Sequence, residues 1–289
     1  MFKIKVADLV VNYNSFHEEF FAKRLEKYLT DEEPMGDIGF EINENITIPP
    51  HTQLSVANRK NICKTDDGML MLYSKNREGR VNFYLEQNHD YTHSLCKTIH
   101  FEPTENYKLT DCDREYMQGG FMFNNLLLKN KGTTLHGSAI SYKGQGIIFS
   151  APPGTGKSTH TEIWKKLFPN DVEYINDDKP CIRFHKGKPY VYGSPWSGKT
   201  DLNNNIKCPL KAIIFIGRSE ENAIKKVGTA QSFSHLNDQT FPPFYDIELF
   251  KKNFDVLENI IKTTPIYWLD CNMDDESAML VRKTIFKER

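Results

Sequence analysis

The segment that most constrains the fold is residues 147–164, "IIFSAPPGTGKSTHTEIW". It consists of an apolar strand-like run, a loop rich in Gly and Pro, and a helix-like run that starts near Thr159. The loop follows the phosphate-loop pattern GxxxxGK[ST], except that Ala151 stands where the pattern has its first glycine. A strand followed by such a loop and a helix is typical of α/β folds, so the segment predicts a central sheet with flanking helices.

The residues of this loop match the chemistry of phosphate binding. Glycines such as Gly154 and Gly156 permit the positive φ angles that turn backbone N–H groups toward an anion. Lys157 is placed to reach β- and γ-phosphates, and the Ser158 hydroxyl to bind Mg²⁺. The helix N-terminus that follows favours negative charge. The predicted nucleotide-binding residues are Pro153, Gly154, Thr155, Gly156, Lys157, Ser158 and Thr159. The alternative is a solvent loop with a stray lysine.

Two adjacent carboxylates, Asp177 and Asp178, follow the strand-like run "VEYIN". At the end of a strand both can reach one site, where one carboxylate holds Mg²⁺ and the other accepts the proton of an attacking hydroxyl. The residues alone do not assign the two roles, and an acidic turn is the alternative. His136, in "TTLHGSAISY", is either a structural or surface-exposed histidine or a group that orients the aspartate or polarises phosphate.

Two further segments carry candidate cations. The stretch "GSPWSGKTD" (193–201) predicts a loop over the site, with Lys199 as a second cation on the transferred phosphoryl group. The alternative for this stretch is a surface turn with a solvated lysine and a packed Trp196. Arg218 ends the strand-like run "AIIFIGR" and either contacts phosphate or base or is solvated.

Four features in the same order resemble the catalytic domain of bacterial HPr kinase/phosphorylase, a group allied to the ATP-dependent phosphoenolpyruvate carboxykinases. They are "LHGSAI", the loop ending "GTGKST", "INDDKP" and "YGSPWSGKT". The resemblance extends over residues 132–218 and looks closest to stand-alone relatives found beside peptide-modification genes, some of which phosphorylate a peptide hydroxyl. The chain shows no counterpart of the longer C-terminal signature of HPr kinase, so neither HPr as substrate nor a reversible reaction is implied.

The resemblance implies an α/β fold with an HPr kinase/phosphoenolpyruvate carboxykinase-like P-loop core and a mainly β N-terminal domain. It implies an enzyme that uses ATP and Mg²⁺ to phosphorylate a Ser or Thr hydroxyl of a peptide or protein. The implied catalytic residues are Asp177 as base, His136, Lys157 and Lys199, and the implied metal ligands are Ser158 and Asp178. HPr kinases form homo-oligomers, so a homo-oligomer is the corresponding expectation here.

The chain divides by pattern near residue 110. Residues 1–110 alternate strand-like runs with polar turns and predict a mainly β domain for acceptor recognition; residues 111–289 predict the P-loop kinase domain. The expected strands before 110 are 3–11, 68–74, 81–87 and 96–102, and the expected helices are 16–29, 113–128 and 246–263. The double glycine Gly119–Gly120 is expected to weaken its helix, and the run "GRSEENAIKK" (217–226) to form an exposed loop-and-helix face.

The composition of the chain disfavours several classes of binding partner and location. The formal net charge of −1 provides no basic field for nucleic acid or acidic membranes. Apolar runs such as Ala212–Ile216 are far too short to span a bilayer. The six cysteines are scattered without a CxxC pair, which favours reduced thiols and a cytoplasmic protein.

Three other functions fit the same motifs. A kinase of a small-molecule metabolite would use the same phosphate loop and base. A nucleotide-binding module without transfer would need no base, so Asp177 disfavours it. A simple NTPase would need a Gln or Glu to position water beside the phosphates, and the sequence shows no evident candidate.

Overall fold

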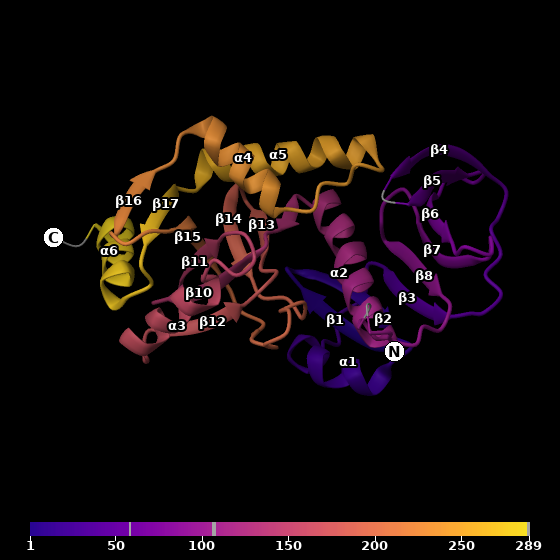
Figure 1. Cartoon of the computed structure of the whole chain (residues 1–289), viewed down its shortest axis with the longest axis horizontal. Coiled ribbons are helices and arrows are strands. Elements are labelled where there is room, and N and C mark those ends of the chain that lie inside the picture. Colours follow the sequence, from indigo (N-terminus) through magenta and orange to yellow (C-terminus); the bar gives the residue numbers. More distant parts are fainter. Residues whose placement is uncertain (58, 106–107, 288–289) are drawn as a thin grey trace. The chain divides into compact units, whose positions relative to one another are not determined.

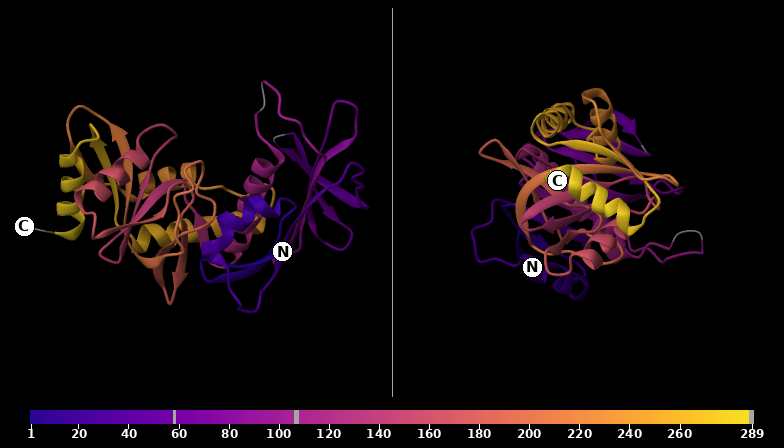
Figure 2. Two further views of the ribbon diagram at one scale, coloured as in Figure 1. Left: turned by 90° about the horizontal axis from the view of Figure 1, so that it is seen from below. Right: turned by 90° about the vertical axis from the view of Figure 1, so that its left-hand side faces the viewer.

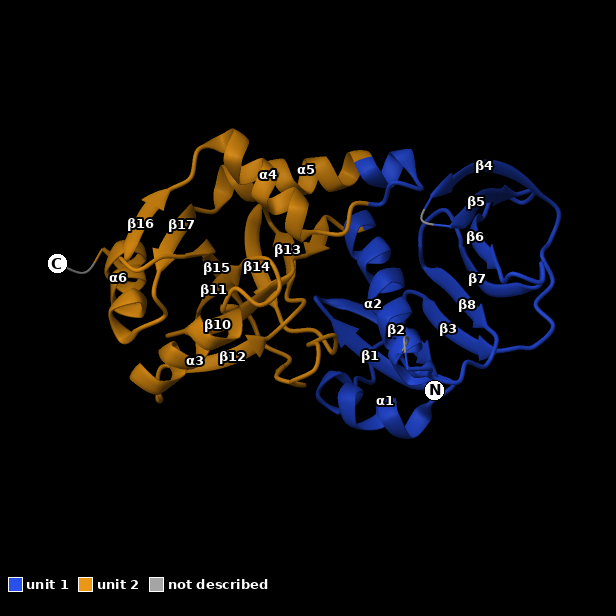
Figure 3. Cartoon of the chain, viewed as in Figure 1, with its two compact units in different colours: residues 1–129, 243–250 blue, residues 130–242, 251–289 orange. Residues whose placement is uncertain are grey.

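The computed structural model describes residues 1–57, 59–105 and 108–287. The chain forms two compact units, which Figure 3 distinguishes by colour. The first unit comprises residues 1–129 and 243–250, and the second comprises residues 130–242 and 251–289. The boundary expected near residue 110 falls at the start of a long helix, and that helix belongs to the first unit.

The first unit is built on one large sheet (Figure 1). Its strands are β1 (Phe2–Val6), β2 (Leu9–Asn14), β3 (Asp37–Ile42), β4 (His51–Ala57), β5 (Lys60–Thr65), β6 (Leu70–Lys75), β7 (Val81–Gln87) and β8 (His93–Thr98). Its helices are α1 (Glu18–Leu25), the 3-10 helix η1 (Glu26–Tyr28) and α2 (Asp111–Lys129). The strand order is β1-β2-β3-β8-β7-β6-β5-β4. Strands β4 to β8 form an antiparallel meander, and β3 runs parallel to β2 and β8.

Helix α2 shows why a double glycine is tolerated inside a helix. A Cβ atom at Gly119 would collide with the hydroxyl of Tyr13, whose side chain is fully buried. The glycine therefore allows the helix backbone to approach β2 closely, and this packing offsets the low helix propensity of Gly. The expected weak helix is one continuous 19-residue helix.

The second unit is a mixed sheet with helices against both faces (Figure 1; Figure 2). Its strands are β9 (Gly132–Thr134), β10 (Gly137–Tyr142), β11 (Gln145–Ser150), β12 (Val172–Asn176), β13 (Cys181–His185), β14 (Lys188–Tyr192), β15 (Lys207–Arg218), β16 (Ala223–Lys226) and β17 (Ile266–Cys271). Its helices are α3 (Lys157–Leu167), α4 (Thr229–Gln239), α5 (Ile247–Thr263), whose first four residues belong to the first unit, and α6 (Asp275–Phe286). Strand β15 is parallel to β11 and to β17, and β14 pairs with it antiparallel.

Alternating side chains of β11 and β15 fill two hydrophobic layers. Phe149 and Ile214 lie in the cluster that contains Trp164 of α3 and Val281 of α6. Their chain neighbours, such as Ile148, lie in the cluster on the opposite face with residues of α4 and α5. Strands buried on both faces are expected in an α/β core, so the second unit has the mixed α/β architecture that the sequence predicts.

Several expected elements differ from the observed ones. The strand expected at 3–11 is a hairpin, because Ala7 and Asp8 adopt the left-handed conformation and turn the chain. The run at 217–226 is not a helical face: it ends in β16, which pairs with β17. Strands β3, β4 and β5 and helix α4 were not expected from the sequence. The strand at 81–87 is confirmed, and the helix expected at 246–263 is confirmed apart from its first residue. Among the described residues, no helix is both long and apolar enough to cross a membrane.

Candidate functional site

The segment predicted to be a phosphate loop, residues 151–158, connects β11 to the first turn of α3, and its backbone has the conformation that its glycines predict. Gly154 and Gly156 have φ angles of 76° and 119°, in the region that favours glycine. A Cβ atom at Gly156 would also lie 2.7 Å from the Cε atom of Met273. Ala151 is buried in the same hydrophobic cluster as Trp164. A small apolar side chain at position 151 therefore caps the core where the strand ends.

Lys157, the first residue of α3, extends back across this loop. Its Nζ atom donates hydrogen bonds to the carbonyl oxygens of Ala151 (2.9 Å) and Pro152 (3.4 Å). Burial lowers the pKa of the Lys157 ammonium, and the charges of Asp178 and Asp177 act in the opposite direction. The lysine of the loop and the carboxylate pair thus lie close enough to influence one another.

Arg218 also binds the phosphate loop. Its guanidinium donates to the carbonyl oxygens of Gly154 (2.8 Å) and Thr155 (3.1 Å). The side chain is exposed at the end of β15, but it is not simply solvated. Arg218 therefore holds the part of the loop that carries the left-handed glycine, and it adds a positive charge there.

Asp177 is buried and accepts hydrogen bonds from two hydroxyls. Ser138 donates to its Oδ1 atom (2.7 Å) and Thr200 to its Oδ2 atom (3.0 Å). The Ser138 oxygen also lies 2.9 Å from the Thr161 hydroxyl, whose single hydrogen is shared between Ser138 and the carbonyl of Ser158 (2.9 Å). A chain of hydroxyls thus connects Asp177 to the first turn of α3.

Asp178 has a different environment. It is more exposed than Asp177, and its Oδ1 atom lies 3.5 Å from Nε2 of His136. The Nδ1 atom of His136 lies 3.0 Å from Oε1 of Gln239. Burial, and next the positive charge of Lys157, lower the pKa of His136. The sequence interpretation paired His136 with Asp177. In the structure His136 lies in the bend between β9 and β10, beside Asp178, whose carbonyl accepts from the Gly137 N–H (3.0 Å).

Asn176 shapes the turn that presents both carboxylates. Its side-chain oxygen accepts from the N–H groups of Asp178 (2.9 Å) and Lys179 (2.6 Å). Its amide nitrogen donates to the carbonyl and hydroxyl oxygens of Ser194. Sequence reasoning missed this residue, as well as Ser138, Thr200 and Gln239. The Asn in "INDDKP" was a usable signal, since Asn side chains commonly bond the backbone two residues later.

The loop from Gly193 to Thr200 packs against the carboxylate pair. Gly198 is left-handed (φ 73°), and a Cβ atom there would lie 3.1 Å from Cβ of Asp178. Trp196 is buried, in agreement with the packed-tryptophan alternative. Lys199 is exposed on this loop, one residue from Thr200, which binds Asp177. The loop therefore contributes a hydroxyl to the site by direct contact, and Lys199 stays a prediction.

The donors at this site are oxygen atoms. Ser158 offers a hydroxyl, and Asp177 and Asp178 offer carboxylates, which are the ligand types that Mg²⁺ prefers. Mg²⁺ is usually bound by one or two protein carboxylates together with substrate phosphates, so this donor set fits the ion. In the part of the chain that the structure describes, no three His, Cys, Asp or Glu side chains are grouped to hold a metal by themselves.

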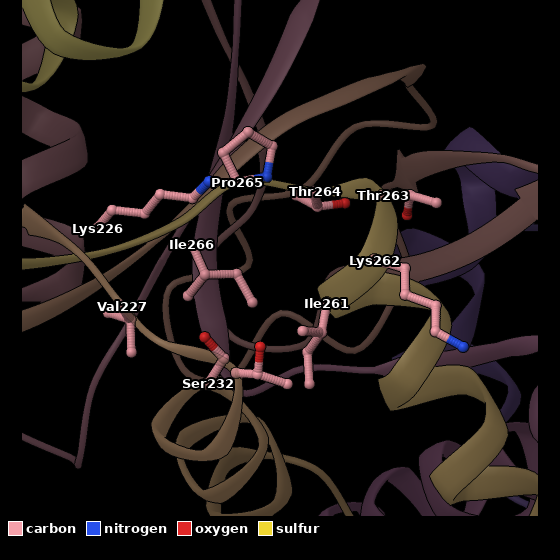
Figure 4. Close-up of a pocket in the computed structure, with 10 residues that line it drawn as sticks. Lys226, Val227, Ser232, Ile261, Lys262, Thr263, Thr264, Pro265 and Ile266 are labelled. Carbon is pink, nitrogen blue, oxygen red and sulfur yellow. The ribbon is translucent and has the colours of Figure 1, made fainter.

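A separate cavity of about 270 Å³ lies elsewhere in the second unit (Figure 4). Residues of β16, the start of α4, the end of α5 and β17 line it, including Lys226, Ser232, Lys262 and Thr264. None of its lining residues belongs to the predicted site.

The chain was compared with known proteins in three ways. No protein-family model matches it, and no curated protein matches it. Among solved structures, it is similar to the Hpr(Ser) kinase/phosphatase from Coxiella burnetii, with 11% sequence identity and a TM-score of 0.33. That similarity covers 53% of this chain and 97% of the other. An identity and a TM-score this low carry no conclusion about the function of this chain.

Proposed function

We propose that the second unit is an ATP- and Mg²⁺-dependent phosphotransferase that phosphorylates a Ser or Thr hydroxyl of a peptide or protein. One observation carries the proposal: hydroxyl contacts through Ser138 and Thr161 connect Asp177 of the carboxylate pair to the first turn of α3, the helix that begins at Lys157. A cation for the β- and γ-phosphates and a base for the acceptor are thereby brought together. Phosphoryl transfer depends mainly on positioning and charge stabilisation, which such a site supplies.

The environments of the two carboxylates suggest separate roles. Asp177 is connected through Ser138 and Thr161 to the first turn of α3, where Ser158 offers its hydroxyl. It therefore suits the metal side of the site. Asp178 is more exposed and has the imidazole of His136 beside it, so it suits the base that accepts the proton of the attacking hydroxyl. This assignment is the reverse of the one that the resemblance implies.

The remaining residues position the reactants. The N–H groups at the start of α3 would bind the phosphates, and Lys157 would exchange its bonds to the loop carbonyls for bonds to phosphate oxygens. Mg²⁺ would be held by Ser158 and Asp177 together with the phosphates, where it offsets their charge. His136, held by Gln239, would stand beside Asp178, with its Nε2 atom 3.5 Å from the Asp178 Oδ1 atom.

The test of transfer uses γ-phosphate-labelled ATP, Mg²⁺ and a lysate of the source cells, with products separated into protein, peptide and small-molecule fractions. Wild type is compared with Lys157→Ala and with Lys166→Ala, a matched change at an exposed lysine on the same helix. We expect label in the protein or peptide fraction that Lys157→Ala lowers at least about 100-fold and Lys166→Ala leaves unchanged. Label only in small molecules would establish the metabolite-kinase alternative. ATP binding without any transfer would establish a binding module.

A second measurement distinguishes the proposed roles of Asp177 and Asp178 as metal ligand and base. Asp178→Asn should abolish transfer but leave the Mg²⁺ concentration for half-maximal ATP binding unchanged. Asp177→Asn should raise that Mg²⁺ concentration about tenfold or more, as expected when one metal ligand is lost. The opposite pattern would restore the assignment with Asp177 as base.

A further inference from the structure

The cavity beside β16 lies away from the phosphate loop, at the other end of β17. Pro265 and Ile266, at the start of β17, line the cavity (Figure 4). Gly156 of the phosphate loop instead lies against the side chain of Met273, two residues beyond the end of the same strand. A ligand in this cavity would therefore occupy a site separate from that of the proposed phosphoryl transfer.

Helix α4 begins at this cavity, and Thr229 and Ser232 from its first turn line it. Its N-cap residue is Gly228, and no side chain caps the helix. The N–H of Ser232 donates to the Gly228 carbonyl (2.9 Å), so the N–H groups of residues 229–231 have no partner within the helix. Such groups, together with the helix dipole, favour an anion. The first turn of α4 therefore offers donors to a negatively charged group.

Two buried hydroxyls of this cavity also lack a partner. Ser232 and Thr264 are only 2% and 3% exposed, and both line the cavity. Among the residues that the structure describes, neither hydroxyl has a hydrogen-bond partner. The Ser232 oxygen points from α4 toward Val227 and Ile266, which also line the cavity (Figure 4). Because buried polar groups are nearly always hydrogen-bonded, these hydroxyls indicate a polar ligand in the cavity.

The charges around the cavity leave a positive balance. Lys226 and Lys262 line the cavity, and none of its described lining residues is acidic. Lys262 is balanced by Glu258, with which it pairs (2.6 Å). The carbonyl end of α5 adds a partial negative charge that the start of α4 balances. Asp255 and Lys225 lie outside the cavity and have opposite charges. In the described chain no acidic side chain pairs with Lys226, so its positive charge remains for a ligand.

We propose that this cavity binds the phosphate group of a small molecule. The donors come from three segments, namely Lys226 on β16, the first turn of α4 and Thr264 before β17. A phosphate presents oxygens in several directions, whereas the two oxygens of a carboxylate lie in one plane. Pockets for drug-sized ligands measure about 300–1,000 Å³, so a volume of about 270 Å³ suits a smaller molecule. Val227, Ile261 and Ile266 provide apolar surface for the part that carries the phosphate. This site is additional to the proposed function and does not depend on it.

The test is calorimetric titration of the full chain with inorganic phosphate and with glycerol 1-phosphate. Every protein in the comparison carries Lys157→Ala, so that the lysine of the phosphate loop does not contribute to binding. Lys226→Gln and Ser232→Ala change the cavity. Lys225→Gln and Ser234→Ala are matched changes at exposed positions on the same strand and the same helix, and neither position lines the cavity.

We expect the protein with Lys157→Ala alone to bind phosphate or its ester. Lys226→Gln should raise the Kd at least about tenfold and Ser232→Ala about fivefold, since each removes a hydrogen bond to a charged group, and the matched changes should leave the Kd unaltered. Ser232→Ala should not lower the urea midpoint without phosphate, because its hydroxyl has no partner in the described chain. Tighter binding of glycerol 1-phosphate would identify an ester as the source of the phosphate group, and equal binding would identify inorganic phosphate.

Each other outcome overturns the proposal. The absence of binding at millimolar phosphate or ester would exclude the site, and an unchanged Kd in Lys226→Gln would place the phosphate elsewhere. Acetate binding as tight as that of phosphate would show that the cavity does not select a phosphate group. A lower urea midpoint for Ser232→Ala would assign its hydroxyl to the fold. Because these titrations contain no ATP and the phosphate-loop lysine is absent, their result is independent of labelled transfer.

Discussion

Each unit contains a fully buried asparagine, and the two are used differently. In the second unit, Asn176 bonds the main chain at Asp178, Lys179 and Ser194 and so fixes the local turn that presents the carboxylates. In the first unit, Asn125 donates to the Gln87 side chain (2.6 Å) and accepts from the Tyr245 hydroxyl (2.6 Å). The first asparagine specifies a short motif. The second joins three segments that are far apart in the sequence.

The largest change in the free energy of unfolding is expected when either of these two asparagine side chains is removed. Asn176→Ala leaves two backbone N–H groups and the Ser194 carbonyl without their partner, which should cost about 3–5 kcal/mol of unfolding free energy. Asn125→Ala leaves two side chains without a partner and should cost about 2 kcal/mol. ATP affinity should fall only in Asn176→Ala. Hydrogen exchange resolved by peptide measures the stability of each unit separately.

The conservative variant Asn176→Asp provides the control. It keeps the oxygen that accepts from Asp178 and Lys179 but loses the donor to Ser194, so it should recover part of the lost stability. Asn125→Ala should lower hydrogen-exchange protection in the first unit only. If it lowered protection equally in both units and also weakened ATP binding, the effect of Asn125 would not be limited to its own unit.

This contrast explains what the sequence could and could not predict. The turns of the predicted phosphate loop and of the carboxylate pair are formed by neighbours within a few residues, so these turns follow from short patterns, whereas their partners Arg218, Ser138 and Thr200 do not. Strands β4 and β5 and the partners of Asn125 depend on pairings across the first unit, for which the sequence carries no local signal. The contact of His136 with Asp178 has the same origin: it arises from the packing of segments far apart in the sequence and not from spacing, so the sequence leaves open which aspartate His136 faces.

The second prediction concerns two histidines whose pKa values move in opposite directions. Burial lowers the pKa of His160, on α3 in the second unit, to about 4. In the first unit, the hydrogen bonds that His100 donates to Glu102 and Asp111 raise the pKa of this exposed histidine. His160 must remain neutral in the folded state, so the unfolded state binds more protons below pH 6.5. Its contribution to stability is present above pH 6.5 and is lost as the pH falls toward 4, by about 3 kcal/mol in total.

Urea unfolding between pH 7 and pH 4, followed by tryptophan fluorescence, measures this loss, because Trp164, Trp196 and Trp268 all lie in the second unit. His160→Gln should flatten the pH dependence of that transition. His100 stabilises the folded state at low pH, and this contribution is lost as the pH rises through its raised pKa. His100→Gln should therefore leave the tryptophan transition unchanged. An equal slope in wild type and His160→Gln would assign the loss to the carboxylates.

The smallest loss of stability is expected at two glycines that have similar backbone conformations but lie in different units. Gly154 in the phosphate loop has a φ of 76° and Gly79 in the first unit a φ of 81°, and a Cβ atom at either would meet nothing within 4 Å. Alanine at either position should therefore cost only the strain of the left-handed conformation, about 1 kcal/mol. Gly154→Ala should in addition weaken ATP binding several-fold, since the loop backbone must turn toward the phosphates, while Gly79→Ala should not change it. Chemical unfolding and ATP titration of the two variants separate these effects. If Gly154→Ala binds ATP as wild type does, the phosphates do not lie against this part of the loop, and the donors must come from Gly156 and the first turn of α3.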